Sequence, residues 1–292
     1  MRIFRNRLMW INYCLFWAKF KWIMIEDIEL ETLINDVYEY YGFDFSSYSR
    51  ASLKRRVNRV MHLDGFRHFH EFLSRVRYDP EYYKRMVDEI TVNVTEMFRD
   101  PAFYAVVRNE ILPLLGTKPF IRLWHAGCST GEEVYSMAIM LKEAGLLHKS
   151  LIYATDINAT VLETAKKGIF PLRMMKEYSE NYRDAGGQED FSSYYIANYG
   201  IAKFNEELAE KMVFSQHNLV SDTSFNEFDL ILCRNVLIYF DNDLQKRVIN
   251  LFDESLAVLG FLALGTKETI KYSISMNKYK QLDKEKIWRK IK

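Results

Sequence analysis

The pattern of apolar and polar positions changes once along the chain. From residue 25 to about residue 88, apolar residues recur every three or four positions, which is the spacing of helices that bury one face. Breaks at Gly42, at Gly65 and at Asp79–Pro80 separate four such helices. The pattern therefore predicts a small all-helical unit over residues 25–88.

From about residue 89 to residue 292, short apolar runs alternate with helical patterns. Strands are predicted at residues 120–124, 151–155, 228–233 and 260–265, and helices at residues 132–144, 158–167 and 241–258. This alternation is typical of an α/β fold with a doubly wound, mostly parallel sheet. A last apolar run at residues 287–291 is placed as an antiparallel strand beside residues 260–265. Residues 171–215 break the alternation and are rich in tyrosine, so we expect an insertion there.

The first 24 residues form a basic and aromatic extension that differs from the rest of the chain. Three arginines precede the apolar stretch from Leu8 to Ala18, and Lys19 and Lys21 follow it. The stretch is too short to span a bilayer, so we expect no integral membrane segment. Three interpretations stay open: an extension that is not native, with the working start at Met24, a peripheral membrane-associating helix, or a secretion signal.

Charge and cysteine content narrow the choice of partners. The formal net charge of +1 gives no overall attraction for nucleic acid, so we expect no nucleic-acid partner. Cys14, Cys128 and Cys233 are far apart and odd in number, which predicts neither a disulfide framework nor a zinc site. We therefore expect no metal site and a reducing compartment, the cytoplasm. We also expect a monomer.

The segment from Phe120 to Glu133 predicts a strand, a glycine turn and the start of a helix. Gly127 and Gly131 bracket the turn, where a missing Cβ lets the backbone approach a ligand closely, as in a nucleotide-type pocket. The spacing is Gly-x-x-x-Gly rather than Gly-x-Gly-x-x-Gly, and Glu132 and Glu133 follow at once. Two acids suit a cationic ligand without phosphate, which indicates S-adenosylmethionine. Alternatively, they only complement the helix dipole.

Polar residues also follow other predicted strands. Asp156 ends the strand at residues 151–155 and can accept both ribose hydroxyls of a nucleoside, or alternatively cap the next helix. Asn218 and Leu219 follow a strand near residue 214 and can contact an adenine edge. Arg234 and Asn235 end the strand at residues 228–233, where ligands bind in open sheets; alternatively, they form a polar loop that only ends a core strand.

Two further clusters carry polar chemistry. In one, Asn93 and Thr95 can hydrogen-bond a ligand and Arg99 can hold a carboxylate bidentately, or alternatively Asn93 and Thr95 cap a helix that contains Phe98. The other cluster lies on the second predicted helix. It is either a solvated face or a docking surface for an acidic partner helix, and its members are Lys54, Arg55, Arg56 and Arg59.

Four of these motifs occur together in a recognisable order. They are Asn-Val-Thr-Glu-Met-Phe-Arg-Asp from Asn93, Ala-Gly-Cys-Ser-Thr-Gly-Glu-Glu-Val-Tyr-Ser from Ala126, Ala-Thr-Asp-Ile-Asn from Ala154, and Cys-Arg-Asn-Val-Leu-Ile-Tyr-Phe from Cys233. Over roughly residues 28–270 the chain resembles the CheR-type chemotaxis-receptor glutamate methyltransferases. The resemblance implies a small helical N-terminal domain, a class I methyltransferase domain with an inserted β-subdomain, and methyl transfer from S-adenosylmethionine to receptor glutamates, leaving S-adenosylhomocysteine.

The resemblance also implies roles for individual residues. The residues that it places at the cofactor site, besides the turn at Gly127, are Asn93, Thr95, Arg99, Glu133, Asp156, Asn218, Leu219, Arg234 and Asn235. It suggests Arg99 and Tyr239 as the catalytic groups that orient the substrate. The basic residues from Lys54 to Arg59 resemble the surface that docks the cytoplasmic helical region of a receptor.

Two departures and two alternatives accompany the resemblance. Val134 stands where the family usually has proline, and Met97 where phenylalanine is commoner, and neither change removes a polar group. One alternative is the same carboxyl methylation on a non-receptor protein or a small acid. The other is a non-catalytic signalling module that binds S-adenosylmethionine.

Overall fold

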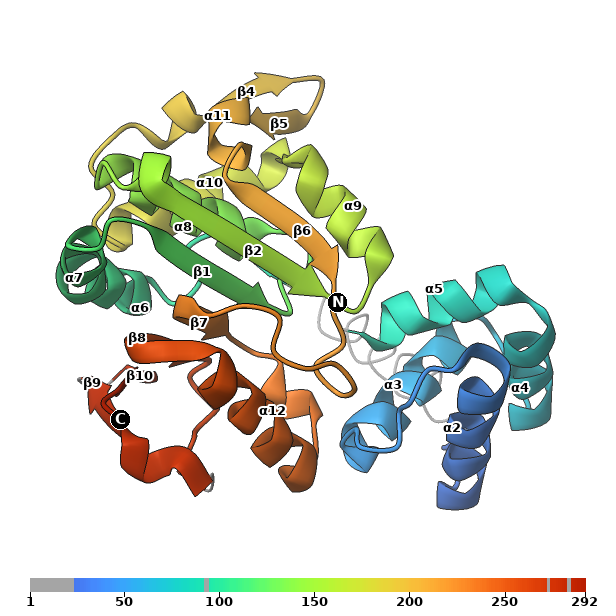
Figure 1. The fold of residues 1–292 in the computed structure, drawn as a ribbon. Helices are drawn as coiled ribbons and strands as arrows, with labels where there is room; N and C mark the ends of the chain where they lie inside the picture. The colour runs from blue at the N-terminus through green and yellow to red at the C-terminus, as the bar shows by residue number, and fades with distance from the viewer. Residues whose placement is uncertain (1–23, 92–94, 272–273, 283–284) are drawn as a thin grey trace, which may run out of the picture. The chain divides into compact units, whose positions relative to one another are not determined.

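The computed structural model describes residues 24–91, 95–271, 274–282 and 285–292, which form two compact units that divide after Ile90 (Figure 1). The expectations for residues 1–23 and for Asn93 lie outside the described residues. Within the described ranges, no helix combines the length and the apolar character that crossing a membrane requires.

The smaller unit consists of the four predicted helices. They are α2 (Asp27–Tyr41), α3 (Arg50–Leu63), α4 (Phe69–Tyr78) and α5 (Pro80–Ile90). Each turns its apolar stripe inward, and Val37, Val57, Phe72 and Met86 are fully buried in the shared core. The predicted break at Gly42 is the C-terminal cap of α2, where a φ of 70° suits glycine. The unit is therefore held together by helix-on-helix packing of amphipathic faces.

A seven-stranded sheet forms the centre of the larger unit, with the strand order β6-β2-β1-β7-β8-β10-β9. The strands are β1 (Ile121–Ala126), β2 (Ser150–Asp156), β6 (Met212–Gln216), β7 (Phe228–Cys233), β8 (Leu256–Leu264), β9 (Tyr279–Leu282) and β10 (Ile287–Lys290). The pairings from β6 through β8 are parallel, whereas β10 pairs antiparallel with both β8 and β9. The doubly wound, mostly parallel sheet is confirmed, and β9 adds an edge strand that the sequence pattern did not predict.

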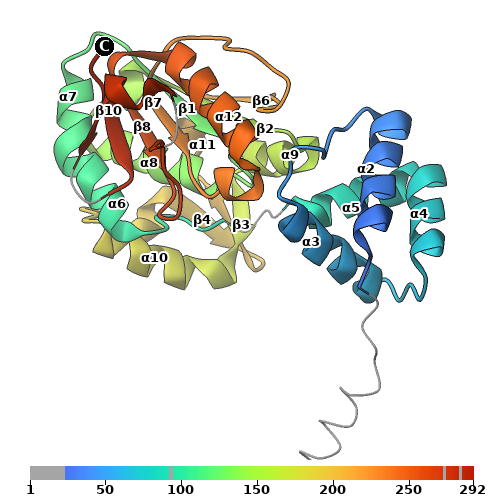
Figure 2. The same cartoon turned by 90° about the horizontal axis from the view of Figure 1, so that it is seen from below.

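Helices cover both faces of this sheet (Figure 2). On one face lies α12 (Asn242–Ser255), and on the other lies α8 (Glu132–Glu143), beside α9 (Ala159–Lys167). Side chains of β1 alternate between the faces: Trp124 contacts Phe252 of α12, with 5.4 Å between ring centroids, whereas Leu123 packs in the core around α8. The helices α6 (Pro101–Val106) and α7 (Leu112–Gly116), joined by the π-helix η1 (Val107–Ile111), were not predicted.

The predicted insertion is a small subdomain with its own antiparallel sheet in the order β3-β5-β4. Its strands are β3 (Ile169–Pro171), β4 (Tyr195–Asn198) and β5 (Ile201–Phe204), and its helices include η3 (Leu172–Met174), α10 (Met175–Asp184), η4 (Phe191–Tyr194) and α11 (Glu206–Ala209). Buried Glu143 at the end of α8 fixes it in place, because this carboxylate accepts hydrogen bonds from the hydroxyls of Tyr182 and Tyr194 and pairs with Arg108. The insertion therefore packs along the flank of α8.

Candidate functional site

A glycine turn joins the end of β1 to the start of α8. Gly127 has a φ of 79°, and a Cβ there would lie 2.5 Å from Cγ2 of Val236. Gly131 has a φ of 95°, and its Cβ would lie 2.9 Å from Cβ of Ala165. The turn is held against β2, because the amide of Gly127 donates to the carbonyl of Thr155 at 2.8 Å. Both glycines are therefore required by backbone conformation and by close packing.

Asp156 lies at the end of β2, beside this turn. Its Oδ2 accepts the amide of Ser129 at 2.9 Å, and its Oδ1 accepts the amide of Asn158 at 3.0 Å. The alternative that Asp156 caps the next helix is wrong, because Asn158 is the N-cap of α9 and accepts the amide of Thr160 at 2.8 Å. Burial raises the pKa of Asp156, and the backbone amides partly offset this effect. A carboxylate offers about four acceptor positions, so this one retains capacity for the hydroxyls of a ligand.

Glu133 belongs to a charged network that joins four separate segments. Its Oε1 lies 2.9 Å from Nδ1 of His125 in β1, and its Oε2 lies 3.2 Å from Nη1 of Arg234, which follows β7. Nη2 of Arg234 in turn donates to Oδ2 of Asp100 at 2.6 Å and to the carbonyl of Arg99 at 3.1 Å. Burial by itself raises the pKa of Glu133, but the hydrogen bond from His125 and the charge of Arg234 outweigh it, so that pKa is lowered. Glu133 is therefore an anion at neutral pH.

Arg234 is an internal group rather than an open ligand contact. Its side chain is 2% exposed, and its guanidinium carbon lies 4.1 Å from the ring centroid of Phe103. Stacking on an aromatic face and pairing with two carboxylates are interactions that the planar guanidinium supports. The structure thus gives Arg234 a role in holding Glu133 and the Asp100 segment together.

Asn235 follows in a left-handed conformation, with a φ of 63°. The backbone N–H of Asn235 donates to Oε2 of buried Glu268 at 3.0 Å, and the same oxygen accepts the backbone N–H of Gly265 at 2.5 Å. Burial raises the pKa of Glu268, and these amides partly offset the rise. Glu268 thus fixes the polar turn after β7, and a ligand contact of Asn235 stays a prediction.

The segment before α6 carries Thr95 and Arg99, which are both half-buried. Nε of Arg99 lies 3.8 Å from Oε1 of Glu96. The alternative of a capped helix that contains Phe98 is wrong, because Phe98 has a φ of 53° and α6 begins only at Pro101. The amide of Phe98 donates to Oγ of Ser136 at 3.0 Å. This contact, like the pairing of Asp100 with Arg234, ties the segment to the core of the larger unit.

The remaining site residues lie in two turns. After β6, Asn218 organises its own turn. Its side-chain Oδ1 accepts the backbone N–H of Val220 at 2.9 Å, and its backbone N–H donates to Oδ2 of Asp222 at 2.8 Å. Leu219 is 8% exposed. Tyr239 ends the short helix η5 (Leu237–Tyr239) and is half-buried. The side-chain oxygen of Asn218 is thus used inside the turn.

The basic residues of α3 do not share one face. Arg55 and Arg59 are exposed, and Lys54 pairs with Asp27 at 2.6 Å. The expectation for Arg56 needs correction, because its side chain is buried and donates to the carbonyl of Ile90 at the end of α5. A buried guanidinium that satisfies a helix terminus stabilises the helical unit and is not available to a partner.

Reasoning from the sequence missed several buried polar groups of the site. His125 lies just beyond the strand predicted at residues 120–124 and was given no role, although in β1 its alternation with Trp124 places it on the α8 side of the sheet. Glu268 lies in no motif, and its role depends on contacts with residues 30 or more positions away. Among the described residues, no group of three or more His, Cys, Asp or Glu side chains could hold a metal ion.

The residues around the glycine turn fit a nucleoside ligand with a cationic end. Oγ of Ser129, beside Asp156, is buried and has no hydrogen-bond partner among the described residues. Glu133 and Asp100 bring two negative charges against the single positive charge of Arg234. An uncompensated negative charge next to the turn suits an amino or sulfonium group and opposes phosphate.

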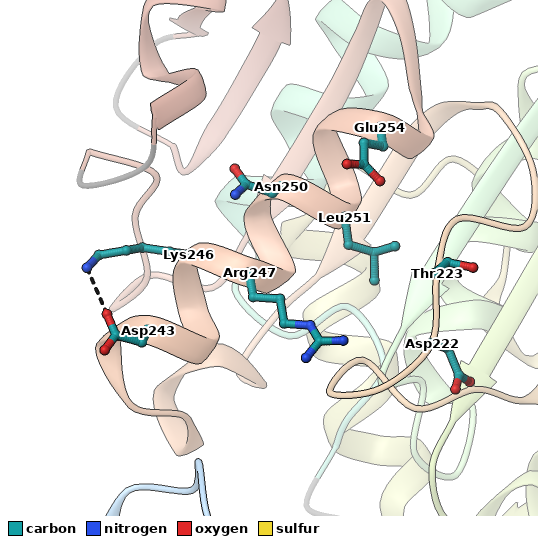
Figure 3. Close-up of a pocket in the computed structure, with 8 residues that line it drawn as sticks. All are labelled: Asp222, Thr223, Asp243, Lys246, Arg247, Asn250, Leu251 and Glu254. Atoms are coloured by element: carbon teal, nitrogen blue, oxygen red, sulfur yellow. Dashed lines mark hydrogen bonds and ion pairs between the residues drawn. The ribbon is translucent and has the colours of Figure 1, made fainter.

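A separate pocket lies between α12 and the loop that follows β6 (Figure 3). It is lined by Asp222, Thr223, Asp243, Lys246, Arg247, Asn250, Leu251 and Glu254. Both acidic and basic side chains line it, and Lys246 pairs with Asp243 at 2.9 Å. None of the site residues discussed above, other than Asp222 in the Asn218 turn, contributes to it.

Comparison with known proteins follows the division into two units. Residues 93–287 match the family model described as CheR methyltransferase, SAM binding domain, and residues 28–91 match the model described as CheR methyltransferase, all-alpha domain. The chain is 48% identical over 265 residues to the “Putative methyltransferase Cher3” of Pseudomonas putida, covering 90% of this chain and 97% of that protein.

More distant relatives align over similar lengths. The “Chemotaxis protein methyltransferase” of Borreliella burgdorferi is 31% identical over 85% of this chain and 90% of that protein. The protein of the same name from Listeria monocytogenes is 32% identical over 85% of this chain and 93% of that protein.

Proposed function

The chain belongs to the CheR methyltransferase family, and from that premise we propose that it transfers the methyl group of S-adenosylmethionine to glutamate side chains in the cytoplasmic helical region of chemotaxis receptors. The names of the Borreliella and Listeria relatives support a chemotaxis role. The observation that carries the proposal is the pair of carboxylates beside the glycine turn. Asp156 lies on the β2 side, and ionised Glu133 lies on the α8 side.

Different residues of the site contact different parts of the cofactor in this proposal. When bound, S-adenosylmethionine supplies an electrophilic methyl group on a positively charged sulfur. In the proposal, Asp156 accepts the ribose hydroxyls, Glu133 attracts the cationic methionine end, and the turn of Asn218 and Leu219 borders the adenine. Buried Arg234 holds Glu133 in place through its pairing with Oε2 of that carboxylate.

The substrate needs no general base. A glutamate side chain has a reference pKa of about 4.3, so its carboxylate is already ionised at neutral pH. An anion and a cation then combine into two neutral products, a change that water opposes because it solvates the separated charges. The task of the chain is therefore to remove water from the carboxylate and to orient it.

Arg99 and Tyr239 are the proposed orienting groups. Arg99 lies next to Asp100, and its own carbonyl is bound by Arg234, so the backbone that carries its side chain is fixed. An arginine held tightly on the nucleophile would lower its reactivity, so Arg99 alternatively grips the carboxylate of the cofactor. Steady-state kinetics of Tyr239→Phe test the other group. A lower turnover number or weaker receptor affinity supports an orienting role, and unchanged values of both refute it.

The main test supplies the protein with labelled S-adenosylmethionine and receptor signalling fragments. Base-labile methyl groups on the fragments are the expected result, since a carboxyl methyl ester is hydrolysed by alkali. Label on another protein or on a small acid instead would indicate the same chemistry on a different substrate. Tight cofactor binding without any transfer would indicate a non-catalytic signalling module.

The docking surface is tested separately at α3. Charge reversal of its two exposed arginines, as Arg55→Glu with Arg59→Glu, is expected to raise the KM for a receptor fragment and leave cofactor affinity unchanged. Arg67→Glu, at an exposed arginine between α3 and α4, is the control, and it is compared with each single variant, Arg55→Glu and Arg59→Glu, so that the change in charge is the same. If the control and these single variants reduce receptor methylation equally, α3 is not the docking surface.

A further inference from the structure

His125 is a fully buried histidine that the proposed function does not yet use. Its position in β1 follows from the two-residue period of a strand. Trp124 faces α12, so Leu123 and His125 face the side of the sheet that α8 covers. The imidazole consequently meets the first turn of α8, where Glu133 stands.

Among the residues that the structure describes, the imidazole makes one polar contact, and it is with Glu133. Nδ1 lies 2.9 Å from Oε1 of Glu133, whereas Nε2 is buried without a hydrogen-bond partner among the described residues. A carboxylate only accepts hydrogen bonds, so Nδ1 carries the proton and donates it.

Glu133 is thereby held from two directions. His125 occupies Oε1, and Arg234 occupies Oε2 at 3.2 Å. Arg234 cannot shift to follow Glu133, because it also binds Asp100 and stacks on Phe103. The carboxylate is 16% exposed, and two fixed donors decide which of its remaining acceptor positions face the turn.

We propose that His125 is a positioning residue of the cofactor site: it fixes the orientation of Glu133 and so sets the affinity for the cationic methionine end of S-adenosylmethionine. This inference rests on the proposed role of Glu133 and does not depend on the identity of the methyl acceptor. A hydrogen bond to a charged group contributes enough for its loss to weaken binding about tenfold or more.

The experiment measures the affinity of the full chain for S-adenosylhomocysteine by calorimetry. His125→Phe keeps a ring and removes the donor, and the dissociation constant is expected to rise about tenfold. His125→Asn, whose amide can donate from a similar position, is expected to restore binding to within about threefold of the unmodified protein. His148→Phe, at an exposed histidine before β2, is the control and is expected to bind normally.

A double-mutant cycle separates positioning from a general structural effect. If His125 acts through Glu133, His125→Phe weakens binding no further in a protein that already carries Glu133→Ala, because the acceptor of its hydrogen bond is then gone. Additive losses would overturn the proposal, as would a His125→Phe variant that binds like the unmodified protein. If His125→Phe does not fold, the same cycle is run with His125→Leu. A receptor fragment that fails to accept methyl would leave this result unchanged, so the two proposals fail separately.

Discussion

Glu132 is a buried acid at the glycine turn, and the cost of its burial can be measured as a change of the protein's stability with pH. It is the first residue of α8 and is 6% exposed, and its Oε2 accepts a hydrogen bond from Oγ1 of Thr130 at 2.6 Å. Burial raises its pKa from 4.5 to about 7, and the hydroxyls of Thr130 and Tyr178 offset only part of that effect. The change Glu132→Gln keeps the shape and the acceptor and removes the ionisation.

Proton linkage gives the direction in which the free energy of unfolding changes with pH. Between pH 4.5 and about 7 the folded protein retains a proton on Glu132 that the unfolded chain has lost. The contribution of Glu132 to the free energy of unfolding therefore falls as pH rises through this window, and it levels off above it. One pKa unit corresponds to about 1.4 kcal/mol, so the full effect is on the order of 3 kcal/mol, most of it developed between pH 5 and pH 8. Glu132→Gln lacks this penalty and is expected to gain stability over the unmodified protein by about 2 to 3 kcal/mol across the same interval.

Urea denaturation at pH 5 and at pH 8 measures this difference. Trp124 and Trp288 are buried in the larger unit and report its unfolding by fluorescence. Asp156 and Glu268 also have raised pKa values, but they are present in both proteins and cancel in the comparison. A stability difference that does not change with pH would refute the reasoning.

The control is Glu163→Gln in α9, whose exposed carboxylate has its pKa lowered by a hydrogen bond from Lys166. A lowered pKa acts in the opposite direction, so this variant is expected to gain nothing as pH rises. A gain equal to that of Glu132→Gln would show that the measured effect does not come from burial.

Two further predictions concern the frame of the site. Gly127→Ala is expected to destabilise the protein by more than about 1 kcal/mol in thermal denaturation, because the new Cβ lies 2.5 Å from Val236; adding Val236→Ala should recover part of the loss, and no recovery would contradict the steric explanation. Arg234→Met is expected to cost about 3 kcal/mol of stability by urea denaturation, because Glu133 and Asp100 lose a buried partner; an unchanged midpoint would contradict this.

The sequence by itself determined the features that depend on short-range patterns. The three-to-four-residue spacing before residue 90 predicted the helices, and the alternation after it predicted the sheet and the returning strand β10. The glycine turn was also predictable, since Gly127 and Gly131 adopt conformations that side chains rarely tolerate. Local periodicity and backbone sterics act between neighbours, so one sequence is enough to reveal them.

Other elements were missed. The helices α6 and α7 were not predicted, although Phe103, Val107, Ile111 and Leu115 recur every four residues across them and are buried. Arg56 belongs to a run of basic residues that the sequence suggested as a surface. The folded structure shows that it is buried and contacts the end of α5. The short edge strand β9 depends on pairing with β10 and has little pattern of its own.

Tertiary structure alone decided which polar groups act together. His125, Glu133, Arg234 and Asp100 come from β1, α8, the end of β7 and the segment before α6, and only the folded sheet brings them within hydrogen-bond distance. A motif states which residue types follow one another, whereas the charge and orientation of Glu133 depend on burial and on partners up to 101 residues away. The chemistry of the site is set by those long-range contacts, because desolvation and pairing exist only after the chain has folded.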